Sequence, residues 1–137
     1  MYFEQISVFI ENKPGRLADV MDLLRQGGID MKALTVADAA DFGIVRIIVD
    51  DTAKALELLR ANSFTANTAK VIMLSVDHEP GALYKVVDVL KDCNVNIKYM
   101  YAVPTAASGK AEFVLRTSDN DNAIKTLTDN GITIIAK

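Results

Sequence analysis

Two short loops hold the residues best suited to bind a small molecule. Asn12–Gly15 and His78–Gly81 both end in Pro-Gly, lie 66 positions apart, and each precede an amphipathic stretch. A helix that starts there presents free backbone N–H groups and the positive end of its dipole. Such a start can hold a carboxylate, and glycine lets the ligand approach the backbone closely. A tight helix start without a ligand is the simpler interpretation of one such loop, and the recurrence at the same place in two units makes ligand binding an equal alternative.

Other polar residues give little reason to expect catalysis. His78 is the only histidine, and no Ser-His-Asp order or metal-ligand cluster accompanies it. We therefore expect it to contact a ligand or solvent, not to act as a general base. Cys93 should be a small half-buried thiol. Asp119 and Asp121 lack the glycine and terminal glutamate of a calcium loop and should cap a helix. The sequence predicts no enzyme, cofactor or metal site.

Charge and cysteine content narrow the class of protein further. The 137 residues include 15 Lys and Arg against 18 Asp and Glu, which gives a formal net charge of −3. With no basic run, nucleic acid is not an expected partner. One cysteine excludes a disulfide framework. No stretch has the pattern of a signal peptide or a membrane helix, so we expect a cytoplasmic protein without membrane contact.

The hydrophobic pattern predicts the same order of elements twice. Ile6, Val8 and Ile10 alternate with polar residues, as in a strand that is buried on one side. After Pro14 an apolar stripe with helical spacing, Leu17–Leu24, predicts an amphipathic helix. Further along, β-branched runs and a second amphipathic stretch complete a β-α-β-β-α-β order. The residues after the second Pro-Gly loop repeat it.

This repeat predicts two α+β domains, residues 1–68 and 69–137, joined only by the short linker 66–69. A β-α-β-β-α-β unit is the ferredoxin-like arrangement, a four-stranded antiparallel sheet with both helices on one face. If the sheet face away from the helices were exposed to water, its side chains should be mostly polar, but many of them are apolar. We therefore expect a homodimer through this outer sheet face. Its predicted apolar residues are Phe3, Phe9, Ile44, Ile48, Val71, Met73, Met100 and Val114.

The repeated pattern resembles the ACT domain. The family pattern is Asn/Asp-x-Pro-Gly-x-Leu, then an amphipathic helix, and the copies continue with Gly-Ile-Asp-Met or Asn-Val-Asn-Ile. His78 departs from this pattern, because Asn or Asp is usual at its position. The segment 40–46 is also similar to a stand-alone bacterial subgroup made almost entirely of two such domains. The chain as a whole resembles a tandem ACT protein with no attached enzyme.

The resemblance implies amino-acid sensing. ACT domains commonly pair side by side through their second strands into one eight-stranded antiparallel sheet, with the helices on one face. Ligands sit at the seam, between the first loop of one domain and the second strand of its neighbour. Carried over by position, one site would combine Asn12, Lys13, Gly15, Arg16 and Leu17 with Asn96 and Ile97. The other would combine His78, Glu79, Gly81, Ala82 and Leu83 with Asp30 and Met31.

In such sites the loop amides would hold the carboxylate, and Asp30 or Asn96 the ammonium group. Because Asp30 is charged, we expect its site to prefer a free ammonium. The chain should then be a non-catalytic amino-acid-binding regulator of a separate protein, with a metabolic enzyme as a possible partner. The alternative is a structural or assembly ACT protein that has lost its ligand and acts by contact. An RNA-binding domain lacks its aromatic-basic strand motif here, and an enzyme lacks any catalytic constellation.

Overall fold

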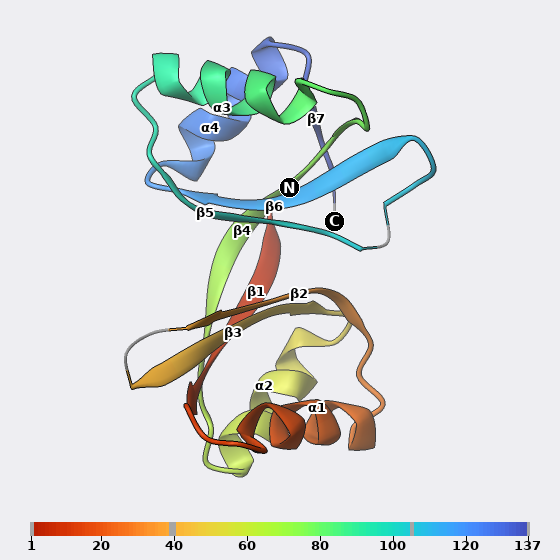
Figure 1. Ribbon diagram of the computed structural model, residues 1–137, viewed down its shortest axis with the longest axis vertical. Coiled ribbons are helices and arrows are strands. Elements are labelled where there is room, and N and C mark those ends of the chain that lie inside the picture. The colour runs from red at the N-terminus through yellow and green to blue at the C-terminus, as the bar shows by residue number, and fades with distance from the viewer. Residues whose placement is uncertain (1, 39–40, 105, 137) are drawn as a thin grey trace. The chain divides into compact units, whose positions relative to one another are not determined.

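The structure is a computed structural model that describes residues 2–38, 41–104 and 106–136, so Ala40 of the segment 40–46 lies outside the described residues. Within them the chain folds into strands and helices in the order that Figure 1 shows. The first elements are β1 (Phe3–Glu11), α1 (Arg16–Gln26), β2 (Met31–Asp38), β3 (Phe42–Val49) and α2 (Thr52–Ala61). They are followed by β4 (Thr65–Asp77), α3 (Ala82–Asp92), β5 (Ile97–Ala102), β6 (Lys110–Thr117), α4 (Asn120–Asp129) and β7 (Thr133–Ile134).

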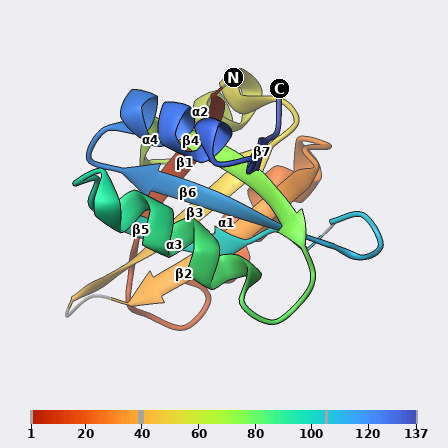
Figure 2. The same cartoon turned by 90° about the horizontal axis from the view of Figure 1, so that it is seen from above.

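The predicted β-α-β-β-α-β order is confirmed in both halves, and the fold is mixed α+β. The strand order is β2-β3-β1-β4 in the first half and β5-β6-β4-β7 in the second. In each half both helices cover one face of that half's own strands (Figure 1). Figure 2 looks onto the helix layer of the second half, where α3 and α4 pack against each other. The second strands, β2 and β5, are therefore edge strands of their own halves.

The described strands number seven, where the sequence predicted eight. The last strand of the first half and the first strand of the second half run together as β4, residues 65–77. The predicted linker 66–69 is wrong, because these residues continue the strand: Ala66 is only 3% exposed and joins the first-half core. Small and polar residues gave this stretch the appearance of a loop, whereas its backbone completes the first-half sheet.

The chain divides into two compact units, residues 4–69 and residues 70–136, with Tyr2 and Phe3 grouped with the latter. The Tyr2 hydroxyl donates a hydrogen bond to Asp121 at the start of α4, and the Lys70 ammonium lies 5.7 Å from the centroid of its ring. Burial and this hydrogen bond raise the pKa of Tyr2 to about 12. The predicted domain boundary between residues 68 and 69 stays a prediction.

Each half has its own hydrophobic core between sheet and helices. The inner-face residues predicted from alternation are confirmed: Ile6, Val8 and Val45 are fully buried, as are Ile72 and Leu74 in the second half. The helices contribute matching leucines at matching positions. Leu24, Leu59, Leu90 and Leu127 are each at most 1% exposed. Burying one such side chain fully contributes about 1.5–3 kcal/mol.

One residue lies on the opposite face from the one predicted. Met100 was expected on the outer face, but it pairs with Leu115 and packs on the second-half core. The pairing register of β5 shifts between Ile97 and Tyr99. A bulge of this kind adds a residue to one strand and reverses the inside–outside alternation after it. Tyr99 and Tyr101 stay on one face, with ring centroids 6.5 Å apart.

Candidate functional site

Both Pro-Gly loops end in a glycine whose backbone has a left-handed conformation. Gly15 and Gly81 are the N-cap residues of α1 and α3, with φ of 90° and 86°. This left-handed region strains any residue that has a Cβ. A Cβ placed on either glycine would meet no heavy atom within 4 Å. The glycine is therefore required by the backbone, and the space beside it is open to a ligand.

The start of α1 has hydrogen-bond donors to spare. The Arg16 N–H bonds weakly to the Lys13 carbonyl at 3.4 Å, and the Asp19 N–H bonds to the Gly15 carbonyl at 3.0 Å. No side chain caps the helix. Among the residues that the structure describes, the N–H groups of Leu17 and Ala18 have no bonded partner. These groups can donate hydrogen bonds to an anionic ligand at the positive end of the helix dipole.

The start of α3 repeats this arrangement. Its first bonds run from the Ala82 N–H to the Glu79 carbonyl at 3.3 Å and from the Lys85 N–H to the Gly81 carbonyl at 3.1 Å, again without a side-chain cap. The other two helices differ. Asp51 accepts a hydrogen bond from the Lys54 N–H at the start of α2, and Asp119 caps α4 in the same way, as predicted. Only the two helices after Pro-Gly loops start open within the described chain.

A cleft of about 280 Å³, the first cleft, lies beside the loop of the first half. Leu17 of α1 and Val36 of β2 form apolar walls and are 37% and 49% exposed. The sheet register brings these elements together, because Glu11 pairs with Phe42 and Asp38 with Gly43. Its lining residues are Ile10, Glu11, Asn12, Lys13, Gly15, Leu17, Val36, Ala37, Asp38 and Gly43. The four from β2 and β3 were missed from the sequence, since only the strand register reveals them.

The second half has an equivalent but smaller cleft, the second cleft, of about 150 Å³. It lies between the start of α3, the end of β4 and the start of β6. Phe113 and Leu83 supply apolar walls, and His78 replaces the amide of Asn12. The lining residues are Val76, Asp77, His78, Glu79, Ala82, Leu83, Ala111 and Phe113. Ala111 and Phe113 were likewise not foreseen from the sequence.

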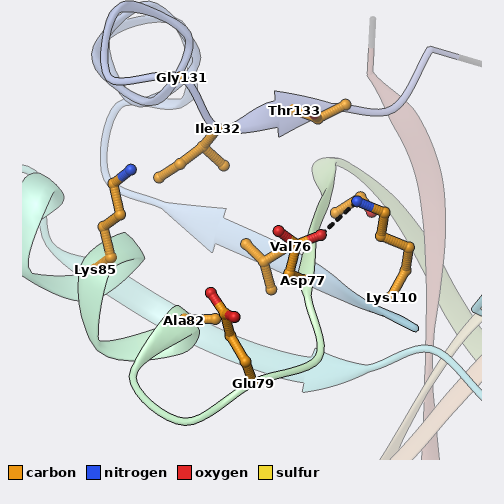
Figure 3. A pocket seen from close by; sticks show the side chains of 10 residues that line it. Val76, Asp77, Glu79, Ala82, Lys85, Lys110, Gly131, Ile132 and Thr133 are labelled. Atoms are coloured by element: carbon orange, nitrogen blue, oxygen red, sulfur yellow. Dashed lines mark hydrogen bonds and ion pairs between the residues drawn. The ribbon is translucent and has the colours of Figure 1, made fainter.

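Equivalent acids at the two loops have different partners. Glu11 forms an ion pair with Lys13 of its own loop at 2.8 Å. Asp77 instead pairs with Lys110 of β6 at 2.5 Å, the dashed contact in Figure 3. The hydrogen bond and charge of Lys13 lower the pKa of Glu11, and those of Lys110 lower the pKa of Asp77. Both carboxylates are therefore charged at neutral pH. In the first cleft Lys13 neutralises Glu11, and the carboxylate of Asp38 also lines that cleft.

Most predicted loop residues line the two clefts, but Arg16 does not. Its guanidinium lies over the Phe64 ring, 4.6 Å from the centroid, and bonds to Asp19 at 3.2 Å. It lines a different cleft, together with Asp22, Leu23 and Asn62. Gly81 sets the backbone at the start of α3 without lining the second cleft. Arg16 is thus held by contacts within its own half, on the side of α1 away from the first cleft.

The predicted second-strand residues lie far from the clefts of their own halves. Asp30 precedes β2, whose other end, at Asp38, borders the first cleft. Eight residues of extended chain separate the two, about 26 Å. Asn96 holds the equivalent place before β5. The backbones of Asp30 and Asn96 are fixed alike, by Asp50 and Ser118 respectively. Their neighbours Met31 and Ile97 are the first residues of β2 and β5.

Two other kinds of site are not found in the described part of the chain. Residues 2–38, 41–104 and 106–136 contain no cluster of His, Cys, Asp and Glu able to hold a metal ion. Among those same residues, no helix has the length and apolar content needed to span a membrane.

Comparisons with known proteins agree with this architecture. The family model described as an ACT domain pair matches residues 1–137. The crystal structure of protein BT0572 from Bacteroides thetaiotaomicron is 40% identical, with a TM-score of 0.92; the match covers 99% of this chain and 93% of that one. No curated protein sequence matches the chain.

Two more distant structures share the fold. The regulatory subunit of aspartate kinase from Thermus thermophilus, in its ligand-free form, is 17% identical with a TM-score of 0.70, over 93% of this chain and 92% of that one. The equivalent subunit from Thermus flavus is 18% identical with a TM-score of 0.66, over 91% and 88%. Since the ACT domain pair model spans the whole length, and BT0572 is similar over nearly all of it, the chain belongs to the family of ACT domain pairs.

Proposed function

We propose that the protein is a non-catalytic regulator that binds a free amino acid at its Pro-Gly loops and controls a separate metabolic enzyme. ACT domain pairs are a regulatory type of domain, and two solved proteins with this fold are named as regulatory subunits of aspartate kinase. Only the regulatory role is extended to this chain. The single cysteine fits a reducing cytoplasm as its place of action.

The observation that carries the proposal is the pair of clefts beside open helix starts. An amino acid has a carboxylate, which suits the spare N–H groups of Leu17 and Ala18. It also has a side chain, which suits the half-exposed apolar walls at Leu17 and Val36. The first cleft, of about 280 Å³, is near the lower end of the range for small-ligand pockets. A free amino acid matches both its size and its mixed chemistry.

The ligand's ammonium group needs an acceptor. Asp38 supplies one carboxylate at the border of the first cleft, but the predicted acceptor Asp30 of the same half does not line it. Asp30 is about 26 Å along the strand from the border of that cleft. We therefore propose that the second strand of a neighbouring ACT domain completes each site: Asn96 and Ile97 beside the first cleft, Asp30 and Met31 beside the second. β2 and β5 are edge strands of their halves and have backbone groups available for such pairing.

The two completed sites would differ in charge. The first would combine the amides of Asn12 and Asn96, and the second the imidazole of His78 with the carboxylate of Asp30. A charged acceptor makes a hydrogen bond roughly twice as strong as a neutral one. The site with Asp30 should therefore bind the ammonium group more tightly. The smaller second cleft should also favour a smaller side chain.

We also propose that the protein is a homodimer through its outer sheet face. Much of that face is already buried in the chain: Ile48 is 2% exposed and Met73 5%. Its exposed apolar part in the first half is an aromatic pair, Phe9 and Phe42, at 36% and 41% exposure with ring centroids 5.9 Å apart. Exposed aromatic side chains of this kind are enriched at protein interfaces.

Thermal denaturation of the full chain with each of the twenty common amino acids tests the proposal. A specific ligand at about 100 times its dissociation constant should stabilise the protein by roughly 2.7 kcal/mol. Calorimetry on Asp30→Ala should then show weaker binding. The matched control is Asp92→Ala, an exposed acid at the end of α3, which should bind as the wild type does. Light scattering on the same samples measures the oligomer.

Two outcomes would overturn the proposal. If no amino acid raises the melting temperature, the protein is instead an assembly ACT protein that acts by contact. If a ligand binds but Asp30→Ala keeps the wild-type affinity, the assignment of Asp30 fails while amino-acid binding stands. If light scattering gave the mass of a monomer, the proposed dimer through the outer face would be wrong, and the proposal for the loop clefts would stand.

A further inference from the structure

The second half has another cleft, the third cleft, on the other side of the start of α3. Its volume is about 180 Å³, and it lies between the end of β4, the first turn of α3 and the segment that leads into β7 (Figure 3). It shares the wall formed by Asp77, Glu79 and Ala82 with the second cleft but opens toward Gly131 and Thr133. It belongs entirely to the second half.

The equivalent place in the first half is also a cleft, of about 250 Å³, but its charged side chains pair with each other. There the Arg16 guanidinium covers the Phe64 ring at 4.6 Å and pairs with Asp19. In the second half Ala82 stands at the position of Arg16 and Lys85 at that of Asp19, 66 residues later. Because Ala82 carries no charge, the ion pair that lines the first-half cleft has no equivalent at these two positions of the third cleft.

The charges around this cleft are arranged as a complementary pair. Figure 3 shows the Lys85 ammonium on one side of the cleft and the Glu79 carboxylate on the other. Asp77 is neutralised by Lys110 at 2.5 Å. Neither Lys85 nor Glu79 takes part in an ion pair within the described residues. One available positive charge and one available negative charge thus face a shared space.

We propose that the third cleft binds a small zwitterionic amino acid, with its carboxylate at Lys85 and its ammonium group at Glu79. Charge-assisted hydrogen bonds at both ends orient such a ligand. The volume far exceeds the roughly 10–15 Å³ that one water needs and is below the range for drug-sized ligands. A ligand of single charge would leave one of the two side chains without its partner. The site shares Glu79 and Ala82 with the second cleft, whereas Gly131 and Thr133 line the third cleft and neither loop cleft.

Nuclear magnetic resonance on the 15N-labelled full chain tests this site directly. Each of the twenty common amino acids is titrated separately, and the amide signals of Gly131 and Thr133 report the third cleft, because these residues line neither loop cleft. At least one amino acid should shift both signals with saturation. Lys85→Glu reverses the charge at the carboxylate end and should weaken this binding about tenfold, whereas Lys85→Met should weaken it about two- to fivefold.

The control is Lys91→Glu, the same charge reversal at the other end of α3, which should leave the titration unchanged. Lys85 and Lys91 are both exposed, so the substitutions should barely affect folding. The proposal is overturned if no amino acid shifts the Gly131 and Thr133 signals with saturation, or if Lys85→Glu leaves the affinity intact. Shifts at Asn12 and Gly15 report the first cleft separately, so the failure of either site is recognised without the other.

Discussion

The loops of the two halves have the same backbone but different side chains. Gly15 and Gly81 have φ within a few degrees of each other, and the first hydrogen bonds of α1 and α3 follow the same pattern. Yet Asn12 is replaced by His78, and the acid at the end of the preceding strand pairs with a lysine of its own loop in one half and of β6 in the other. The two halves therefore share the backbone of the loop and differ in the side chains that line the clefts.

The difference extends to the far side of each helix start. Each half has a cleft there, but in the first half Arg16 covers Phe64 and pairs with Asp19, whereas in the second half Ala82 and Lys85 stand at the positions of Arg16 and Asp19. Two changes of side chain in the first turn of one helix therefore change the charges that line a cleft.

The largest predicted effect concerns the hydrophobic cores, where matching side chains of the two halves should contribute equally to stability. Leu24→Ala and Leu90→Ala remove matching side chains that are 1% and 0% exposed. Each should lower the free energy of unfolding by about 2–5 kcal/mol, measured by urea denaturation. Val87→Ala, on an exposed part of α3, should change it by less than about 0.5 kcal/mol. If either leucine variant lowered the free energy of unfolding by as little as Val87→Ala, the two cores would not be equivalent.

The second prediction concerns the backbone that the two loops share. Gly15→Ala and Gly81→Ala place a Cβ in a left-handed conformation and should each cost about 1–2 kcal/mol of stability. The cost is one of backbone strain, since no atom lies within 4 Å of the new Cβ. Gly15→Asn should recover part of the loss, because Asn tolerates this conformation. Thermal and urea unfolding measure these differences.

Equal losses at the two glycines would support a common backbone requirement. A loss at Gly15 with none at Gly81 would show that the second loop relaxes, and would weaken the equivalence of the clefts. These variants report stability, so amino-acid affinity is compared only among those that remain folded.

The sequence predicted the parts of the fold that depend on local patterns. Alternation in β1 identified its core face correctly, and in the stripe after Pro14 Val20 and Leu24 are buried, whereas Leu17 is half-exposed at the first cleft. Asp119 was predicted as a cap from its local sequence and caps α4, whereas Asp121 lies in the first turn of that helix. The loop residues Asn12 and His78 were found from their recurrence, and both line clefts.

Features that depend on pairing between distant segments were missed. The continuity of β4 through Ala66 depends on its partners in the sheet, so its small residues were read as a linker. The register shift before Tyr99 turned Met100 inward, and no local signal marks it. Val36 and Gly43 line the first cleft only because β2 and β3 end beside the loop. The third cleft combines the start of α3 with the segment before β7, which lie about 50 residues apart in the sequence.

The smallest predicted effect concerns the ion pairs of the two loops and the pKa values of their carboxyl groups. Lys13 lowers the pKa of Glu11, and Lys110 lowers the pKa of Asp77. A carboxyl whose pKa is lower in the folded state stabilises the fold above its unfolded pKa, and this contribution is lost as pH falls through the folded value. Both pairs should therefore contribute a little at neutral pH and fade below about pH 4.

Carboxyl signals in a magnetic resonance titration distinguish the two pairs. Lys110→Met should raise the pKa of Asp77 toward its ordinary value and leave Glu11 unchanged, and Lys13→Met should do the reverse. Since all four side chains are exposed, added salt should reduce both shifts. If either lysine variant moved both acids equally, the charges would act through the general field of the protein. The distinction between a pair closed within one loop and a pair that joins a loop to β6 would then have no electrostatic basis.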